Sequence, residues 1–175
     1  MTQRINIVLF GIGKTGSALI NKALKNRKDL AIDEHLDIRF PVITNSTVAF
    51  FEKEGANYSW EANFIQFGIP FKLEDVVEYV HKNKLHNLVA IDATGSAEFV
   101  KQYVGLLKSG FSLISINETL NRLHPDFETE VVRTALNRGL DYSFLNLPKG
   151  GTDTSAADAL FEAIVALAQK TKAVA

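Results

Sequence analysis

The sequence predicts a single α/β domain with a doubly wound, mostly parallel sheet and helices on both faces. Two observations support this fold class. Short β-type runs alternate with helical stretches, and the first run, Arg4 to Phe10, is almost entirely apolar, as a strand buried on both faces requires. Short connections between such elements imply a parallel sheet covered on both sides. The chain of 175 residues has the length of one domain, which is expected to span residues 1–175.

The predicted elements follow one another in a regular order. Pro41 lies in a strand expected over residues 36–44 and suggests an edge position, because proline cannot donate to a ladder. Residues 46–71 show no clean period and are expected to form an irregular segment whose aromatic residues belong to the core. The remaining helices are expected over 14–28, 73–84, 97–109, 125–138 and 154–170, and the remaining strands over 88–93, 111–116 and 140–145.

The composition excludes several classes of function. Nineteen basic and twenty acidic residues give a net charge of −1, so no basic surface favours nucleic acid or an anionic membrane. The absence of cysteine excludes disulfides, thiolate metal sites and thiol nucleophiles. None of the four histidines has a metal-ligand spacing, and no apolar run approaches the roughly 18 residues of a membrane span. We therefore expect a cytoplasmic protein without a metal, a nucleic acid or a membrane as partner.

One glycine motif points to a ligand. GIGKTG matches G-x-G-x-x-G and lies between a predicted strand and a predicted helix, the context in which the pattern indicates a dinucleotide site. The first glycine would allow a tight turn, the second a close approach of a pyrophosphate, and the third close helix packing. A glycine turn without a ligand is the alternative, whereas a P-loop is excluded because its first glycine would fall at Val8. The expected phosphate-binding residues are Gly11, Ile12, Gly13, Lys14, Thr15 and Gly16.

Two further loops follow predicted strands at the same edge of the sheet. After the second strand, an NAD site usually has an acidic residue for the ribose and an NADP site an arginine. Here Asn45, Ser46 and Thr47 offer neither, and because they cannot neutralise a 2′-phosphate, NAD is favoured over NADP. After the strand over 88–93, small polar groups face the same crevice, and Ser96 can also cap the next helix. These residues are Ala93, Thr94, Gly95 and Ser96.

Several stretches of the chain resemble the nucleotide-binding domain of homoserine dehydrogenases, particularly the type fused to aspartokinase. They are INIVLFGIGKTGSALI, VITNS, VAIDATGSAEFVKQYVGLLKSGFSLISIN and FETEVVRTALNRGLDYSFL, within residues 4–145. The resemblance implies a Rossmann-type, NAD(P)-binding domain of an oxidoreductase of amino-acid biosynthesis. It places the cofactor phosphates at residues 11–16, the adenosine end at 45–47, and the nicotinamide ribose near 93–96 and Asn117.

The chain departs from the family pattern in three places. In the family, the strand ending at Asn117 is followed by a lysine that handles the proton of the substrate hydroxyl. Here that position is Glu118, whose carboxylate would repel an anionic substrate, so no catalytic residue is assigned. Thr47 stands where family members often have arginine or lysine. Finally, only about 30 residues follow the strand over 140–145, where a substrate-binding and dimerisation domain would begin.

Those last residues resemble the end of homoserine dehydrogenases, where a Gly-rich loop and an amphipathic helix return to the nucleotide-binding domain. The chain thus resembles the family with its middle removed: a core, 4–145, a junction loop, 146–153, and a C-terminal packing helix, 154–172. Thr152 or Asp153 is the expected N-cap of that helix. Its apolar face is predicted to contain Ala156, Leu160, Ile164 and Leu167.

The favoured function is binding of a nicotinamide dinucleotide without complete catalysis by the chain alone. Two alternatives stay open. One is an active oxidoreductase on a small aldehyde or alcohol, such as aspartate semialdehyde or homoserine, and the other is a cofactor-free interaction module. A homo-oligomer is also expected, because the domain that dimerises in the family is absent and its loss would expose sheet edge or apolar surface.

Overall fold

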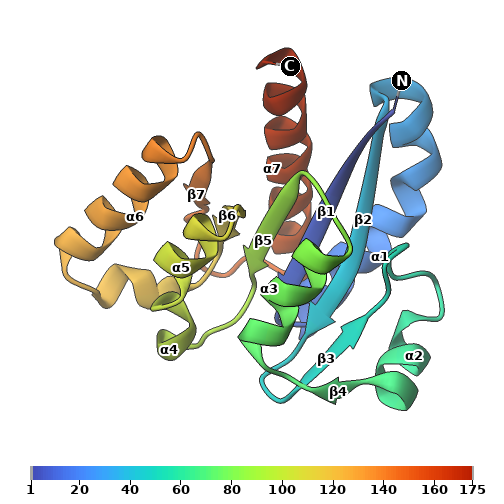
Figure 1. Cartoon of the computed structure of the whole chain (residues 1–175), viewed down its shortest axis with the longest axis horizontal. Helices are drawn as coiled ribbons and strands as arrows, with labels where there is room; N and C mark the ends of the chain where they lie inside the picture. Colours follow the sequence, from blue (N-terminus) through green and yellow to red (C-terminus); the bar gives the residue numbers. More distant parts are fainter. Residues whose placement is uncertain (1, 175) are drawn as a thin grey trace.

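A seven-stranded sheet forms the centre of the molecule (Figure 1). The computed structural model describes residues 2–174. The strands lie in the order β4-β3-β2-β1-β5-β6-β7. The pairs β2–β3 and β3–β4 at one edge are antiparallel, and the other neighbouring strands pair in parallel. The strands are β1 (Gln3–Phe10), β2 (Leu36–Thr44), β3 (Val48–Phe51), β4 (Ile69–Pro70), β5 (Leu88–Asp92), β6 (Ser112–Ser115) and β7 (Tyr142–Phe144). The helices are α1 (Lys14–Asp29), α2 (Trp60–Phe67), α3 (Leu73–Lys82), α4 (Ala97–Val100), α5 (Tyr103–Lys108), α6 (Pro125–Asn137) and α7 (Asp153–Val174), with a π-helical turn η1 (Leu30–Glu34) and a 3₁₀ helix η2 (Glu118–Arg122).

Helices cover both faces of the sheet, as the predicted fold class requires. Along β1, Ile7 and Leu9 belong to one hydrophobic core, and Val8 and Phe10 belong to the other. This alternation is that of a strand buried on both sides. The first core includes residues of α1, α2 and α7, and the second includes residues of α3, α5 and α6. The predicted doubly wound α/β fold is therefore confirmed.

Pro41 lies in an interior strand, so the edge position predicted from it is wrong. β2 pairs with β1 on one side and with β3 on the other. The register between β1 and β2 shifts between Asn6 and Val8, so that Phe40 and Pro41 form an irregularity in the ladder. On the other side, the pairing with β3 begins only at Val42. A bulge of this kind accommodates proline inside a sheet, because the missing N–H is not needed there.

Residues 46–71 are more regular than their sequence indicated. They form β3, α2 and β4, which extend the sheet beyond β2. The two strands are only four and two residues long, too short for a period to show in the sequence. The expectation that the aromatic residues here are core residues is only partly right: Trp60 is buried, but Tyr58 and Phe67 are 76% and 60% exposed.

The helix expected over residues 97–109 is interrupted. At residues 101 and 102 the backbone N–H groups donate to carbonyl groups three residues back, at 3.2 and 2.9 Å, which separates α4 from α5. The tighter turn is local, because α5 then continues to Lys108. Gly110, with φ of +98°, follows as the predicted left-handed stop.

The last helix, α7, packs beside α1 and lies behind the sheet in Figure 1. Its N-cap is Thr152 rather than Asp153. The Thr152 hydroxyl oxygen accepts from the Ser155 N–H at 3.0 Å, and the Thr152 N–H donates to the Ser155 hydroxyl at 2.9 Å. The buried face of α7 contains Ala156, Ala157, Leu160, Ile164 and Ala168, and Leu167 packs beside them half-buried.

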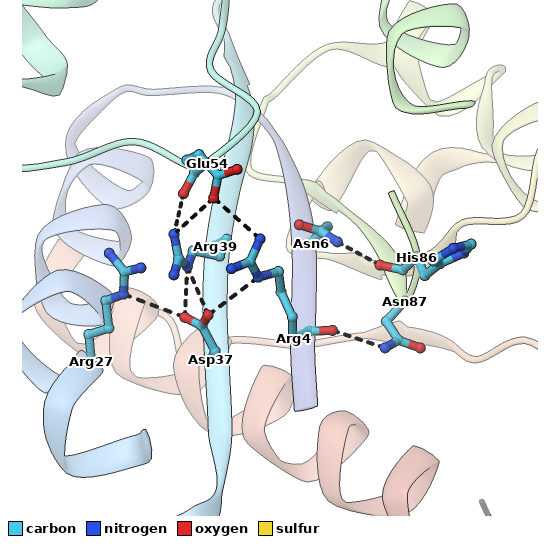
Figure 2. A network of polar contacts seen from close by, with 8 residues as sticks. All are labelled: Arg4, Asn6, Arg27, Asp37, Arg39, Glu54, His86 and Asn87. Atoms are coloured by element: carbon cyan, nitrogen blue, oxygen red, sulfur yellow. Dashed lines mark hydrogen bonds and ion pairs between the residues drawn. The ribbon is translucent and has the colours of Figure 1, made fainter. Parts of the chain in front are cut away.

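An ionic cluster joins the early residues of β1 and β2 to the end of α1 (Figure 2). Arg39 Nε lies 2.8 Å from Asp37 Oδ1, and the Nε atoms of Arg4 and Arg27 each lie 3.4 Å from the same carboxylate. Burial works to raise the pKa of Asp37, but the hydrogen bond and charge of Arg39, with the charges of Arg27 and Arg4, outweigh it and hold the pKa below its usual value. The cluster lies at the end of β1 and β2 opposite to the glycine motif.

Candidate dinucleotide-binding site

A cavity of about 750 Å³ opens at the carboxyl ends of β1, β2 and β5. The loops that follow these three strands contribute its lining, which is the arrangement expected for a ligand crevice in a doubly wound sheet. The predicted residues that line it are Gly11, Ile12, Gly13, Asn45, Ser46, Ala93, Thr94, Gly95 and Ser96. The predicted residues outside its lining are Lys14, Thr15, Gly16, Thr47 and Asn117.

The three glycines of the motif have different surroundings. Gly11 has φ of +101°, and a Cβ on it would lie 2.7 Å from the carbonyl oxygen of Ala93. A Cβ on Gly16 would lie 2.0 Å from the carbonyl oxygen of Gly11, so only glycine allows α1 to pack this closely on the turn. Gly13 differs, because a Cβ on it would meet no atom within 4 Å. The turn itself therefore requires Gly11 and Gly16 but leaves open space beside Gly13.

The start of α1 faces this turn without a capping side chain. Gly13 is the N-cap residue, and the first turn of α1 carries no acidic residue. The free N–H groups and the partial positive charge of a helix N-terminus bind anionic groups such as phosphate. Lys14 and Thr15 begin the helix, but neither lines the cavity, and the Thr15 hydroxyl donates to the Asp153 carboxylate at 3.3 Å.

The loop after β2 is held by Asn45. Its side-chain oxygen accepts from the N–H groups of Thr47 at 2.9 Å and Val48 at 2.7 Å. That oxygen is therefore occupied in the turn between β2 and β3, and the exposed Ser46 is the hydroxyl of this loop that lines the cavity. Among the described residues that line the cavity, the charged members are Glu74 and Glu98, and none is a lysine or an arginine.

A buried polar network supports the loop after β5. The Asp92 carboxylate is fully buried and accepts from the Thr94 N–H and hydroxyl at 2.9 and 2.6 Å. It also accepts from the Tyr103 hydroxyl and, at 3.0 Å, from the Asn117 amide. Burial, and then the charge of Asp92, raise the pKa of Tyr103. The phenol therefore keeps its proton and donates a hydrogen bond to this carboxylate. With several donors, Asp92 fixes the start of the loop that lines the cavity.

Asn117 and Glu118 lie beyond this network. The Asn117 side chain is fully buried: its amide donates to the Ser96 carbonyl at 2.9 Å, and its oxygen accepts from the Thr119 hydroxyl at 2.7 Å. Asn117 thus supports the loop over residues 93–96 from behind. Glu118 is exposed and lines a second hollow of about 530 Å³, together with residues 147–153 and the start of α7.

Sequence reasoning missed one wall of the cavity. Phe71 reaches it from the connection between β4 and α3, Leu73 and Glu74 reach it from the start of α3, and Phe99 reaches it from α4. Phe10 joins two of these residues, because its ring centroid lies 6.1 Å from that of Phe71 and 4.5 Å from that of Phe99. No local motif marks these residues, and the position of Phe71, Leu73 and Glu74 depends on the pairing of β3 with β4.

The loop before α7 lies next to the glycine motif. Asp153 contacts Thr15, and farther along both helices Lys22 of α1 pairs with Asp158 at 2.5 Å. Lys22 Nζ also lies 5.3 Å from the centre of the Phe161 ring, a cation–π distance. The N-termini of α1 and α7 are therefore held side by side.

Two other classes of site have no counterpart in the described part of the chain. Between residues 2 and 174, no group of three or more histidine or acidic side chains is arranged to hold a metal ion. Within the same residues, none of the helices combines the length and the apolar character needed to cross a membrane.

Solved structures share the fold. A hyperthermophilic archaeal homoserine dehydrogenase in complex with NADPH superimposes with a TM-score of 0.62 at 17% identity, covering 81% of this chain and 44% of that one. A Staphylococcus aureus homoserine dehydrogenase gives 0.60 at 16% identity, covering 94% and 44%. At these identities the likeness shows the fold.

No family model matches the chain. A bifunctional aspartokinase/homoserine dehydrogenase of Buchnera aphidicola is 24% identical over 143 residues, 81% of this chain and 17% of the relative. The corresponding protein of Haemophilus influenzae is 24% identical over 118 residues, 67% of this chain and 14% of the relative. The chain therefore spans less than a fifth of the length of these relatives. Within that part, the resemblance to homoserine dehydrogenases predicted from the sequence motifs is confirmed.

Proposed function

We propose that the chain binds a nicotinamide dinucleotide, NAD(H) or NADP(H), in the cavity at the carboxyl ends of β1, β2 and β5. The observation that carries this proposal is the glycine at position 13. Its backbone is extended, with φ of −66° and ψ of −158°, a conformation open to other residues, and a Cβ would meet no atom. The fold itself does not require glycine there, whereas a phosphate group approaching the backbone does.

The residues of the cavity suit the three parts of such a cofactor. The N-terminus of α1 and the turn over residues 11–13 suit the pyrophosphate, and Asn45 and Ser46 suit the adenosine end. The loop over residues 93–96 suits the nicotinamide ribose. When bound, a nicotinamide supplies hydride chemistry, and these residues bind and orient it. The archaeal homoserine dehydrogenase, solved with NADPH, supports this assignment by analogy of fold.

We further propose that the chain alone does not complete a dehydrogenase reaction. Glu118 stands at the position where the resemblance implies a lysine, and it faces the second hollow rather than the cavity. In this proposal residues 4–145 are the binding core, 146–153 a junction loop and 154–172 a packing helix. We also propose a cytoplasmic location, which cell fractionation tests, and self-association, which sedimentation over a range of concentrations tests.

Titration with NADH and NADPH tests the proposal directly. Trp60 does not line the cavity and donates its indole N–H to Asn21 at 2.9 Å, so the fluorescence of the reduced nicotinamide is the better readout. If neither cofactor binds below about 1 mM, the upper end of usual enzyme KM values, the proposal is wrong. If a cofactor binds and homoserine or aspartate semialdehyde changes the nicotinamide absorbance, catalytic incompleteness is refuted and the oxidoreductase alternative holds.

A further inference from the structure

We infer that Glu74 makes the cavity selective for NAD(H) over NADP(H), by accepting a hydrogen bond from the adenosine ribose and repelling a 2′-phosphate. This inference rests on the proposed function, because it names the cofactor that the same cavity takes. The start of α3 then supplies the acidic partner of the ribose that the loop after β2 lacks.

The pairing of β3 and β4 places Glu74 at the adenosine end. Val48 lies opposite Pro70 in that pair, and the Phe71 N–H donates to the Thr47 carbonyl at 2.9 Å. The chain therefore enters α3 directly beside the turn that follows β2. Glu74, the second residue of α3, lines the cavity together with Ser46 of that turn.

Glu74 is available to a ligand. Its carboxylate makes no hydrogen bond or ion pair with any residue of the described chain, and its side chain is exposed. The other acidic residue of the lining, Glu98, is held by Lys101 at 2.9 Å. The side-chain oxygen of Asn45 is engaged by backbone N–H groups of its own turn. Among the described residues at this end of the cavity, Glu74 therefore has the carboxylate that is free to bind a ligand.

The charge balance of the lining gives the direction of selectivity. Of the residues that the structure describes, those lining the cavity include two carboxylates and no lysine or arginine, and Lys14 and Lys72 are not part of the lining. A 2′-phosphate carries nearly two negative charges. At about 5 Å from a carboxylate in water, this repulsion disfavours NADP(H) by about tenfold. The ribose 2′-hydroxyl of NAD(H) instead donates to the carboxylate, and such a charged hydrogen bond strengthens binding by about tenfold or more.

A purely structural role for Glu74 predicts a different result. Acidic residues in the first turn of a helix stabilise its N-terminus, and both Glu74 and Asp75 occupy that turn of α3. Asp75 is also exposed but does not line the cavity. Asp75→Asn is therefore a matched control, because it removes the same charge from the same turn without changing the lining.

Calorimetric titration of the wild type, Glu74→Gln and Asp75→Asn with NADH and with NADPH tests the inference. We expect the wild type to bind NADH about tenfold or more tightly than NADPH, and this preference to shrink at high salt. Glu74→Gln should bring the two affinities to within about threefold, and Asp75→Asn should leave the wild-type ratio within about twofold. Glu74→Arg should reverse the preference, because arginine binds a phosphate.

The outcomes separate this inference from the proposed function. If NADH binds but Glu74→Gln keeps the wild-type ratio, or if the wild type binds NADPH as tightly as NADH, the role of Glu74 is refuted and dinucleotide binding stands. Equal loss of selectivity in Asp75→Asn also refutes it, since the effect would then belong to the general charge of α3. If neither cofactor binds the wild type, both the inference and the proposed function fail.

Discussion

Replacing Gly13 with alanine should weaken dinucleotide binding while leaving the fold intact. The new Cβ would meet no protein atom within 4 Å, and the backbone at this position is extended, so the folded state accepts alanine without strain. Because alanine also restricts the unfolded chain, the free energy of unfolding should stay the same or rise by about 0.4–1 kcal/mol. The methyl group would instead occupy the space through which a pyrophosphate approaches the N–H groups of α1.

The size of the binding defect follows from the hydrogen bonds at risk. A hydrogen bond to a charged group contributes about 1.5–3 kcal/mol, so losing one backbone–phosphate bond weakens binding by roughly ten- to a hundredfold. Gly16→Ala is the contrasting variant. Its Cβ would lie 2.0 Å from the Gly11 carbonyl oxygen, so the backbone must shift, and overpacking of this kind costs about 1–3 kcal/mol in the free energy of unfolding.

Urea denaturation and NADH fluorescence titration, run on the same preparations, check both effects. Gly105→Ala is the control: Gly105 lies exposed in α5, away from the cavity, and a Cβ there also meets no atom within 4 Å. It should be as stable as wild type or more so and bind NADH normally. The reasoning is wrong if Gly13→Ala binds NADH as well as the wild type, or if it destabilises the fold as much as Gly16→Ala.

Three further predictions concern stability, each measured by urea denaturation. Burial, and to a smaller extent Glu128, raises the pKa of Tyr142 from its usual value of 10.0 to about 12. Stability that is present below pH 10 is therefore lost as the pH rises toward 12. Tyr142→Phe should flatten that loss and raise stability at neutral pH by up to about 1 kcal/mol, because the buried hydroxyl has no partner among the described residues. The pKa of Asp37 is lowered in the folded state, so its contribution to stability is present above pH 3.8 and is lost in acid. Asp37→Asn should lower the free energy of unfolding by about 1 kcal/mol at pH 7, and this difference should vanish as the pH falls through the folded-state pKa of Asp37. Thr152→Ala removes the N-cap of α7 and should cost about 1 kcal/mol, with Thr154→Ala in the same turn as control.

Features that depend on sequence neighbours could be predicted, and those that depend on distant pairing could not. The sequence predicts a strand over residues 36–44, with the bounds of β2, because apolar residues first alternate with Asp37 and Arg39 and then follow one another up to Thr44. Pro41 misled the prediction of its position, since the sequence cannot show a register shift against β1. The strands β3 and β4 were missed because their few residues are stabilised by pairing rather than by their own pattern.

The same distinction applies to the candidate site. The loops over residues 11–16 and 93–96 carry small residues in a recognisable order directly after apolar strands, so the sequence alone predicts that they lie at a ligand crevice. Glu74 and Phe71 carry no such mark, and they reach the cavity only because β4 hydrogen-bonds to β3. The resemblance places Asn117 at the nicotinamide ribose, but its side chain is buried behind the loop over residues 93–96 and does not line the cavity.

The side-by-side position of α1 and α7 has a consequence for the order in which the chain folds. The contact between Thr15 and Asp153 spans 138 residues of sequence, and that between Lys22 and Asp158 spans 136. The helices of the opposite face, α3, α5 and α6, follow one another along the chain. Closing a long loop costs more entropy than closing a short one, so the face with local connections should consolidate first. Until α7 docks, a refolding intermediate would leave apolar residues of β5 and β6 uncovered, and that interval is when the chain is most prone to aggregate.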